Sequence, residues 1–171
     1  EPARPHPGVA SARPATVAAI PIGDSERLRG TRRAMAHSMT LSRDQIASCT
    51  VFDDADLNNW TRKSNYTARL LRAIAAGCKA ESGLNAWYDA ESQSRKVMAR
   101  VDVAIAIDSE EGLIVPVIRD VAARSAAQLR SEIARLKAAA QARTITVEEL
   151  KDFTIMLSNF GTIAGRYATP L

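Results

Sequence analysis

Hydrophobic side chains follow two alternating periods along the chain. They recur at helical spacing in residues 67–79 and 126–141, and Ser125 provides a cap for the second of these helices. Strand-like stretches, in which apolar residues alternate with others or run together, cover residues 101–107, 113–118 and 153–158. Because helices and strands follow one another along the sequence, the pattern predicts an α/β layered fold.

Weaker local signals come from the N-terminal third of the chain. A helix is predicted to begin near Glu26, with Asp24 or Ser25 as its cap. Its apolar stripe is thin and consists of Leu28, Met35 and Met39. Residues 49–52 predict a short strand, and Asp56 is expected to cap a short helix after it.

Glycine, proline and capping residues set the expected ends of several elements. Gly83 is expected to end the first of the two long helices. Pro116 cannot donate a hydrogen bond to a ladder, so the strand at 113–118 should lie at a sheet edge or contain a bulge. Thr146 and Glu149 have the spacing of a capping box and predict a short helix.

The composition is that of an ordinary globular domain, since 46% of the 171 residues are hydrophobic and 25% are charged. The two cysteines, Cys49 and Cys78, make no disulfide framework or CxxC metal site, and they fit a reducing, cytoplasmic compartment. Helical spacing favours Cys78 as a small core residue over a nucleophile. No apolar run reaches the roughly 18 residues of a membrane span, so no membrane association is expected.

Basic residues are concentrated at the start of the chain. Residues 1–33 hold six arginines against three acidic residues, whereas the whole chain has a net charge of +4. The arginines at the predicted helix start oppose the helix dipole, so either solvent or an anionic partner must stabilise them. Aromatic residues make up only 5% of the chain, which argues against nucleic-acid binding. A basic nucleic-acid binder stays open only as an alternative.

Acidic residues and histidines offer little independent catalytic chemistry. Asp53, Asp54 and Asp56 could form a metal site, but helix capping and solvation explain them more simply, and no metal is expected. His6 lies in a proline-rich segment and His37 in the first predicted helix, and neither belongs to a metal motif or a nucleophile elbow. The residues alone indicate a soluble α/β domain and leave catalysis open.

Five segments in register resemble the catalytic domain of the dihydrolipoamide acyltransferases, the E2 components of 2-oxo acid dehydrogenase complexes. They are LRGTRRAM at 28–35, FDDADL at 52–57, LNA at 84–86, IAIDSEEGLIVPVIRD at 105–120 and TIMLSNFGTIAG at 154–165. The resemblance covers residues 24–171 as the catalytic domain. It implies that the Ala/Pro-rich residues 1–23 are an interdomain linker, although their composition also allows a disordered terminus.

The resemblance implies a fold like that of chloramphenicol acetyltransferase, a mixed sheet with packed helices, here without its C-terminal part. It also implies a homotrimer that can build a larger core, with the active site between two subunits. The implied reaction moves an acyl group between dihydrolipoamide and coenzyme A. The lipoyl group would be carried on a separate domain, and the E1 and E3 components would bind through other domains. Acetyl and branched-chain acyl groups both stay open.

The resemblance also assigns roles to individual residues. Ser158 matches the catalytic hydroxyl that donates to the tetrahedral oxyanion, and Asn159 matches a coenzyme A contact. Asp108 matches an acidic residue at the coenzyme A end of the channel, and Asn65 and Lys137 fall at two further pocket positions. Simpler roles stay open beside these, namely turn formation for the first three residues and plain surface positions for the last two.

The sequence departs from the family in two places. It contains no DHRxxDG motif, whose histidine removes the thiol proton in the family, so we expect this chain to be C-terminally incomplete and inactive alone. The segment at 57–67 is short and has no counterpart of an arginine that touches coenzyme A in the family. An incomplete sequence explains the missing motif more simply than a naturally degenerate protein does. The alternative function is a core-forming scaffold without acyl transfer.

Overall fold

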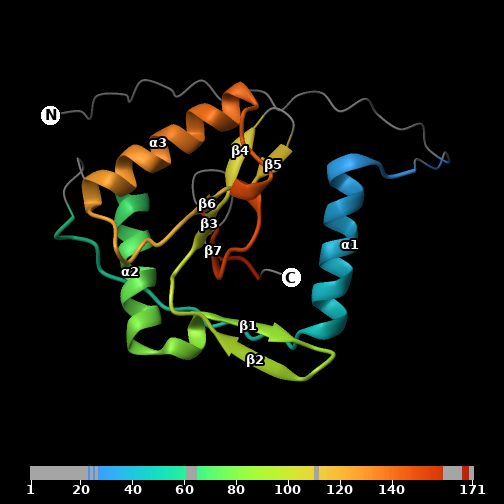
Figure 1. Cartoon of the computed structure of the whole chain (residues 1–171), viewed down its shortest axis with the longest axis horizontal. Helices are drawn as coiled ribbons and strands as arrows, with labels where there is room; N and C mark the ends of the chain where they lie inside the picture. Colours follow the sequence, from blue (N-terminus) through green and yellow to red (C-terminus); the bar gives the residue numbers. More distant parts are fainter. Residues whose placement is uncertain are drawn as a thin grey trace, which may run out of the picture.

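The computed structural model describes residues 23, 25, 27–60, 65–109, 112–159 and 167–169. Along the described chain, two α-helices come first, followed by a run of short strands, a third α-helix and a final strand. The colours of Figure 1 follow this order, and the combination of helices with a mixed sheet confirms the predicted α/β class. The predicted linker at 1–23 lies outside the described residues, apart from Gly23. Within the described ranges, no helix combines the length and the apolar character needed to cross a bilayer.

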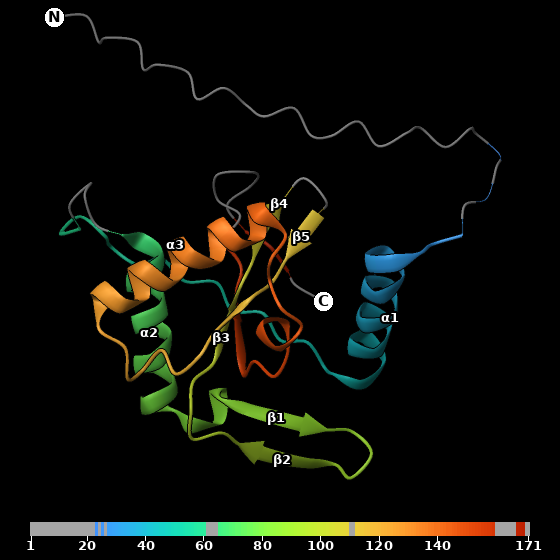
Figure 2. The same cartoon turned by 45° about the horizontal axis from the view of Figure 1, so that its top comes forward.

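A small mixed sheet lies at the centre of the fold. Its middle strand, β3 (Val103–Ile105), pairs antiparallel with β6 (Val117–Ile118) and parallel with β7 (Ile155–Leu157). Two helices, α2 (Tyr66–Ala80) and α3 (Ala126–Ala142), contact each other on one side of the molecule (Figure 2). The helices and the sheet share one hydrophobic core, whose most enclosed side chains include Leu71, Val103, Ile118, Leu129 and Leu136.

Both long helices are confirmed at their predicted positions. Each has an apolar face and a side-chain cap. The Asn65 side-chain oxygen accepts a hydrogen bond from the Ala68 N–H at 2.9 Å and starts α2. A full capping box starts α3, in which Ser125 and Gln128 bond each other's backbone N–H groups at 3.2 and 2.8 Å. Local sequence signals and core packing therefore agree in these two helices.

The strands predicted at 101–107 and 113–118 are each interrupted. The first divides into β3 and β4 (Ile107–Ser109), and the second divides into β5 (Gly112–Ile114) and β6. Pro116 lies at the second interruption, where it has no N–H to donate but its carbonyl accepts a 2.9 Å hydrogen bond from Ile105. As expected from this proline, β6 is an edge strand of its sheet.

Two predicted elements late in the chain are confirmed in shorter form. The strand predicted at 153–158 is β7, and the helix predicted from the Thr146 and Glu149 capping pattern is a single 3₁₀ turn, η2 (Glu148–Leu150). The Glu149 carboxylate accepts the Thr146 N–H at 3.0 Å, as the pattern predicts.

An unpredicted hairpin, β1 (Ala86–Asp89) and β2 (Ser94–Val97), extends away from the end of α2 (Figure 1). The predicted helix end at Gly83 is wrong, because α2 stops at Ala80 and Gly83 lies in a 3₁₀ turn, η1 (Ser82–Leu84). Asn85 fastens the base of the hairpin by donating from its side-chain amide to the Met98 and Arg100 carbonyls at 2.7 and 3.1 Å. Most hairpin residues are exposed, so no buried face marked these strands in the sequence.

Helix α1 (Gly30–Gln45) stands apart from the rest of the described chain in both ribbon views (Figures 1 and 2). Its described side chains are exposed, except that of the half-buried Ser42. The predicted start near Glu26 is wrong, and Asp24 and Glu26 lie outside the described residues. The helix begins instead at Gly30, whose φ of +53° is a conformation that glycine adopts without strain.

The segment between α1 and α2 is not a strand, so the prediction for 49–52 is wrong. Its backbone is irregular and pairs with no other strand of the described chain, and Val51 is 84% exposed. Asp56 caps a turn rather than the predicted helix, because its carboxylate accepts the Asn58 N–H at 2.8 Å and no helix follows within the described residues before 65. Apolar residues without a neighbouring edge to pair with do not form a ladder.

Candidate functional site

The parallel pairing of β3 with β7 brings three predicted site residues to the same end of the sheet, beyond the carboxyl ends of these two strands. We refer to this end as the sheet edge. Ile105 lies opposite Leu157, and the next N–H along, that of Ala106, donates to the Leu157 carbonyl at 3.3 Å. Ser158 and Asn159 follow β7 directly, while the chain leaving β3 continues into β4, which carries Asp108. Ligands of α/β proteins commonly bind outside the carboxyl ends of parallel strands, and these polar residues lie at such an edge.

Asp108 is held within a strand rather than in the turn that the sequence suggested as its simpler role. It lies opposite Leu113 in the antiparallel β4–β5 ladder. Its side chain is exposed, as are those of Ser158 and Asn159. Within the described part of the chain, none of these three side chains has a hydrogen-bond partner or an ion-pair partner.

Asn65 caps the start of α2 and Lys137 lies on α3, so neither belongs to the strands of this sheet edge. The Asn65 oxygen is used to cap α2, which leaves its amide NH₂ for other partners. Lys137 follows the fully buried Leu136 on α3 and is itself exposed. Helix α3 contacts β4, the strand that carries Asp108. In the described structure, however, neither Asn65 nor Lys137 forms a hydrogen bond or ion pair with the sheet-edge residues.

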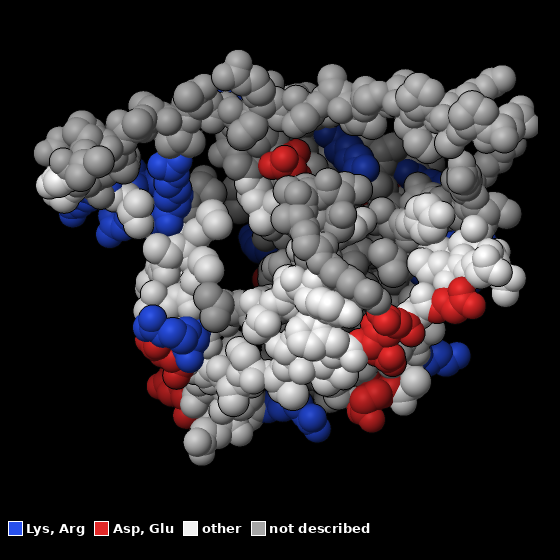
Figure 3. Space-filling view, turned by 180° about the vertical axis from the view of Figure 1, so that it is seen from behind, with Lys and Arg blue, Asp and Glu red and all other residues white. Residues whose placement is uncertain are grey.

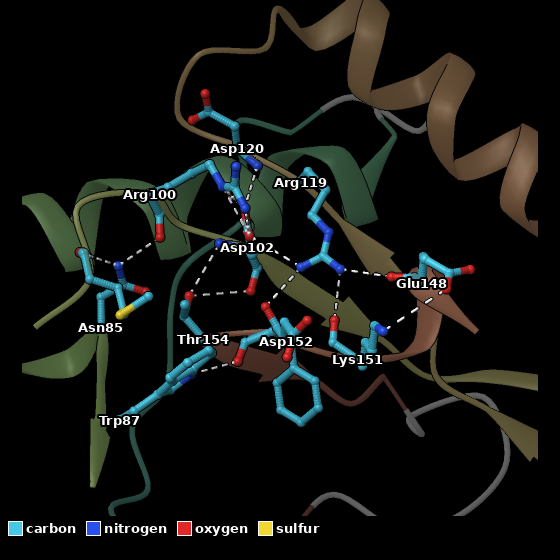
Figure 4. Close-up of polar contacts among 12 residues, drawn as sticks. Asn85, Trp87, Arg100, Asp102, Arg119, Asp120, Glu148, Lys151, Asp152 and Thr154 are labelled. Atoms are coloured by element: carbon cyan, nitrogen blue, oxygen red, sulfur yellow. Dashed lines mark hydrogen bonds and ion pairs between the residues drawn. The ribbon is translucent and has the colours of Figure 1, made fainter. Parts of the chain in front are cut away.

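A buried carboxylate, that of Asp102, lies just before β3 and gathers several donors around it (Figure 4). Its side chain is only 3% exposed. It accepts hydrogen bonds from the Arg100 Nε and Nη2 at 2.8 and 2.7 Å, from the Arg119 Nη1 at 3.2 Å, and from the Asp120 N–H at 2.8 Å. Burial opposes its ionised form, but these donors outweigh burial and lower the pKa of Asp102.

The sequence analysis did not single out Asp102, or the Arg119 and Thr154 side chains that bond to it. One signal was available, because Asp102 places a charge inside the apolar alternation of residues 101–107. Its partners gave no signal, since Arg119 and Thr154 are 17 and 52 positions away along the chain. Only the folded sheet brings them to the carboxylate and its backbone.

The aspartates that follow Phe52 do not converge on a common point. Asp53 accepts the Asp54 N–H at 2.8 Å, and Asp56 serves the turn described above. Among the described residues, no group of three or more His, Cys, Asp or Glu side chains is arranged to hold a metal ion. A hollow of about 430 Å³ lies between residues 49–54 and 167–168, where the Phe52 and Tyr167 rings meet edge to face at 5.0 Å.

The two cysteines differ in environment. Cys49 is exposed beside this hollow, whereas Cys78 lies on α2 and is buried in the hydrophobic core. Burial raises the pKa of the Cys78 thiol, which keeps it protonated. Cys78 is therefore a small core residue, as its helical spacing predicted, and not an activated nucleophile.

Positive charge is concentrated at the start of α1, where Arg27, Arg29, Arg32 and Arg33 are all exposed. Figure 3 shows basic side chains gathered at this end of the helix, with a gap between the helix and the rest of the molecule. Nothing in the described chain forms an ion pair with these four arginines. The sequence of α1 contains no Phe, Tyr or Trp side chain on which a nucleic-acid base could stack.

Comparisons with known proteins agree with this fold. A profile of the family described as "2-oxoacid dehydrogenases acyltransferase (catalytic domain)" matches residues 22–171. The chain is 26% identical over 162 residues to the dihydrolipoyllysine-residue acetyltransferase component of the pyruvate dehydrogenase complex of Mycoplasma capricolum. That alignment covers 86% of this chain but only 37% of the relative, so the chain spans well under half of the relative's length.

Solved structures give the same result. A truncated catalytic core of the 2-oxoacid dehydrogenase multienzyme complex from Thermoplasma acidophilum matches with a TM-score of 0.77 and 26% identity, over 86% of this chain and 74% of that chain. Dihydrolipoamide acetyltransferase from Azotobacter vinelandii matches with a TM-score of 0.75 and 25% identity, over 99% and 73%. That structure belongs to work on a serine, a histidine and an asparagine in the catalytic mechanism of the Azotobacter enzyme.

The fold is therefore that of the α/β catalytic cores of 2-oxo acid dehydrogenase complexes, which confirms the fold class predicted from the sequence. The match to the family profile extends over most of the sequence, from residue 22 onward. The chain belongs to the family of 2-oxoacid dehydrogenase acyltransferase catalytic domains.

Proposed function

We propose that this chain is the coenzyme A side of an acyltransferase site that moves an acyl group between dihydrolipoamide and coenzyme A. The observation that carries the proposal is the β3–β7 register, which puts Ser158 and Asn159 at the same sheet edge as Asp108. All three side chains are exposed and have no partner in the described chain. The lipoyl group would arrive on a separate domain, and the acyl group would be acetyl or branched-chain.

Each residue at the sheet edge has one chemical task in this proposal. The Ser158 hydroxyl donates a hydrogen bond to the oxygen that becomes negative as the thioester carbonyl turns tetrahedral. The Asn159 amide and the Asp108 carboxylate bind polar groups of coenzyme A and fix its thiol near that carbonyl. Asn65 and Lys137 are assigned to the same pocket with less structural support, because they lie away from the sheet edge.

The general base is not among these residues. The sequence has two histidines, and neither belongs to a DHRxxDG motif. His37 lies on α1, apart from the sheet, and His6 lies outside the described residues. We assign proton removal from the thiol to a histidine that these 171 residues do not contain. The chain alone should therefore bind coenzyme A without efficient acyl transfer.

Assembly is part of the proposal, as a homotrimer able to form a larger core. Helix α1 supports it, because Met35 and Met39 on the helix and Leu28 just before it are 44–45% exposed and lie outside the hydrophobic core of the described chain. Exposure of these apolar side chains to water is unfavourable in free energy, and burial against another subunit would remove that exposure. Contacts with E1 and E3 through other domains, and a cytoplasmic location, belong to the same proposal.

Calorimetric titration of the chain with coenzyme A tests the proposal, with the mass of the protein measured in parallel by light scattering. Asp108→Ala and Asn159→Ala should each weaken binding by about tenfold, the effect of losing a hydrogen bond or two. Glu91→Ala, which removes an exposed carboxylate near the hairpin tip, should bind like the unchanged chain. A trimer that does not bind coenzyme A would contradict the proposal and favour the non-catalytic scaffold.

A further inference from the structure

We propose that Thr154 and Arg119 are positioning residues that fix the register of β7 against β3 and so place Ser158 and Asn159 at the sheet edge. Both residues lie at the far end of these strands from that edge, around Asp102 (Figure 4). The inference rests on the proposed function only for its second half, the placing of site residues. The register itself is a property of the fold.

The Thr154 hydroxyl forms hydrogen bonds with both backbone groups of Asp102, the residue just before β3. Its oxygen accepts the Asp102 N–H at 3.1 Å, and its proton can be donated to the Asp102 carbonyl at 3.3 Å. The Thr154 N–H also donates to that carbonyl at 2.9 Å. The neighbours of Thr154 are Phe153 and Ile155, which have no side-chain hydroxyl, so a slip of one residue in either direction would lose this contact.

Arg119 forms hydrogen bonds with the backbone of the segment just before β7. Its guanidinium donates to the backbone carbonyls of Glu148, Lys151 and Asp152 at 2.8, 2.7 and 2.8 Å, and it also pairs with the Asp102 carboxylate. One planar side chain thus binds three carbonyls between residues 148 and 152 and the carboxylate of Asp102, which lies just before the central strand (Figure 4). A lysine would keep the positive charge, but it lacks the planar guanidinium whose N–H groups form these hydrogen bonds simultaneously.

We call the contacts of Thr154 and Arg119 around Asp102 the clasp. The clasp determines the geometry of the chain where β7 ends. Ile155 and Leu157 pack against the core, whereas Met156 between them is exposed. Because side chains alternate between the two faces of a strand, a slip of one residue would turn every following side chain to the opposite face. Ser158 and Asn159 come directly after the paired residues and would move with them. The clasp therefore sets where their polar groups point.

Amide hydrogen exchange of the full chain, read by NMR, tests the clasp directly. The reporter is the Ala106 N–H, which donates to Leu157 at the site end of the ladder. Thr154→Val keeps the shape but removes the hydroxyl, and it should speed exchange at Ala106 and weaken coenzyme A binding by about tenfold each. Thr154→Ser should restore both to within about twofold of the unchanged chain. Arg119→Lys should act like Thr154→Val.

Ser125→Ala is the matched control, because it removes the hydrogen bond from Gln128 that caps α3, and that bond involves neither β3 nor β7. It should lower the melting temperature without changing Ala106 exchange or coenzyme A affinity. The proposal is overturned if Thr154→Val leaves Ala106 exchange unchanged, or if Ser125→Ala speeds it equally. If Thr154→Val speeds exchange but the unchanged chain does not bind coenzyme A, the clasp stands and the proposed function fails. Thr154→Val and Thr154→Ser keep the test decisive should Arg119→Lys fail to fold.

Discussion

Replacing Asp102 by alanine should be among the most damaging single substitutions in this chain. The carboxylate is 3% exposed and neutralises two arginines, of which Arg119 is 29% exposed and Arg100 is 60% exposed. Arg100 can return to water, but Arg119 loses its counter-charge and the Asp120 N–H loses its acceptor. Breaking a buried ion pair from one side costs about 3–5 kcal/mol, and we expect the lower half of that range.

Urea unfolding at neutral pH, followed by circular dichroism, measures this cost. With a slope of about 2 kcal/mol per molar urea, the midpoint should fall by about 1.5–2 M while the slope stays the same. Asp44→Ala is the control, since it removes an exposed carboxylate whose partner is the adjacent Arg43, and it should change the free energy of unfolding by less than about 0.5 kcal/mol. A loss below about 1 kcal/mol for Asp102→Ala would refute the reasoning.

The pH dependence gives a second check on Asp102. Its pKa is lowered in the folded chain, so its contribution is fully present above the ordinary carboxyl pKa of about 4 and is lost as the pH falls through the lower, folded value. The stability difference between the unchanged chain and Asp102→Asn should therefore be constant near neutral pH and shrink in acid. A difference that grows on acidification would contradict the assignment.

Three further predictions concern assembly, core packing and turnover. The double substitution Met35→Asp and Met39→Asp should change the unfolding free energy of the dissociated chain by less than about 0.5 kcal/mol, because both side chains are already exposed. It should abolish trimers in sedimentation velocity, and trimers that survive it would contradict the role given to α1. Leu136→Ala should cost about 2–5 kcal/mol in urea unfolding, since this fully buried side chain leaves a cavity between α3 and the sheet; a loss below about 1 kcal/mol would contradict the core described above. In a coupled acetyl-transfer assay, the 171-residue chain should be about 100- to 10,000-fold slower than a version extended by a DHRxxDG segment, and equal rates would show that another residue, such as His37, supplies the base.

The helices could be predicted because their local signals and their tertiary environment agree. In α3, the Ser125 cap and the apolar spacing of Leu129, Ile133 and Leu136 both describe the observed helix. The hairpin of β1 and β2 could not be predicted in this way, because most of its side chains are exposed. It is held by strand pairing, by the Asn85 hydrogen bonds at its base and by a 2.9 Å hydrogen bond from the Trp87 indole N–H to the Phe153 carbonyl. Residues 49–52 show the reverse case, in which strand-forming side chains find no edge to pair with in the described chain.

The candidate site was accessible from the sequence only through family resemblance. Ser158, Asn159 and Asp108 form no metal motif and no triad, and their proximity depends on a parallel pairing between segments about 50 residues apart. The contacts around Asp102 escaped prediction for the same reason, since they join the residue before β3, the residue after β6 and the segment before β7. Local patterns report caps and buried faces, whereas sites assembled across a sheet require its topology.

The central claim is that Ser158 stabilises the oxyanion of an acyl-transfer site. The most direct measurement is steady-state acetyl transfer from acetyl-coenzyme A to dihydrolipoamide by the chain extended with a DHRxxDG segment, with and without Ser158→Ala. Because the hydroxyl meets charge that develops only in the transition state, kcat should fall by about 100-fold while KM for coenzyme A stays nearly unchanged. A normal kcat together with a lowered melting temperature would contradict the account and leave Ser158 as a structural residue after β7.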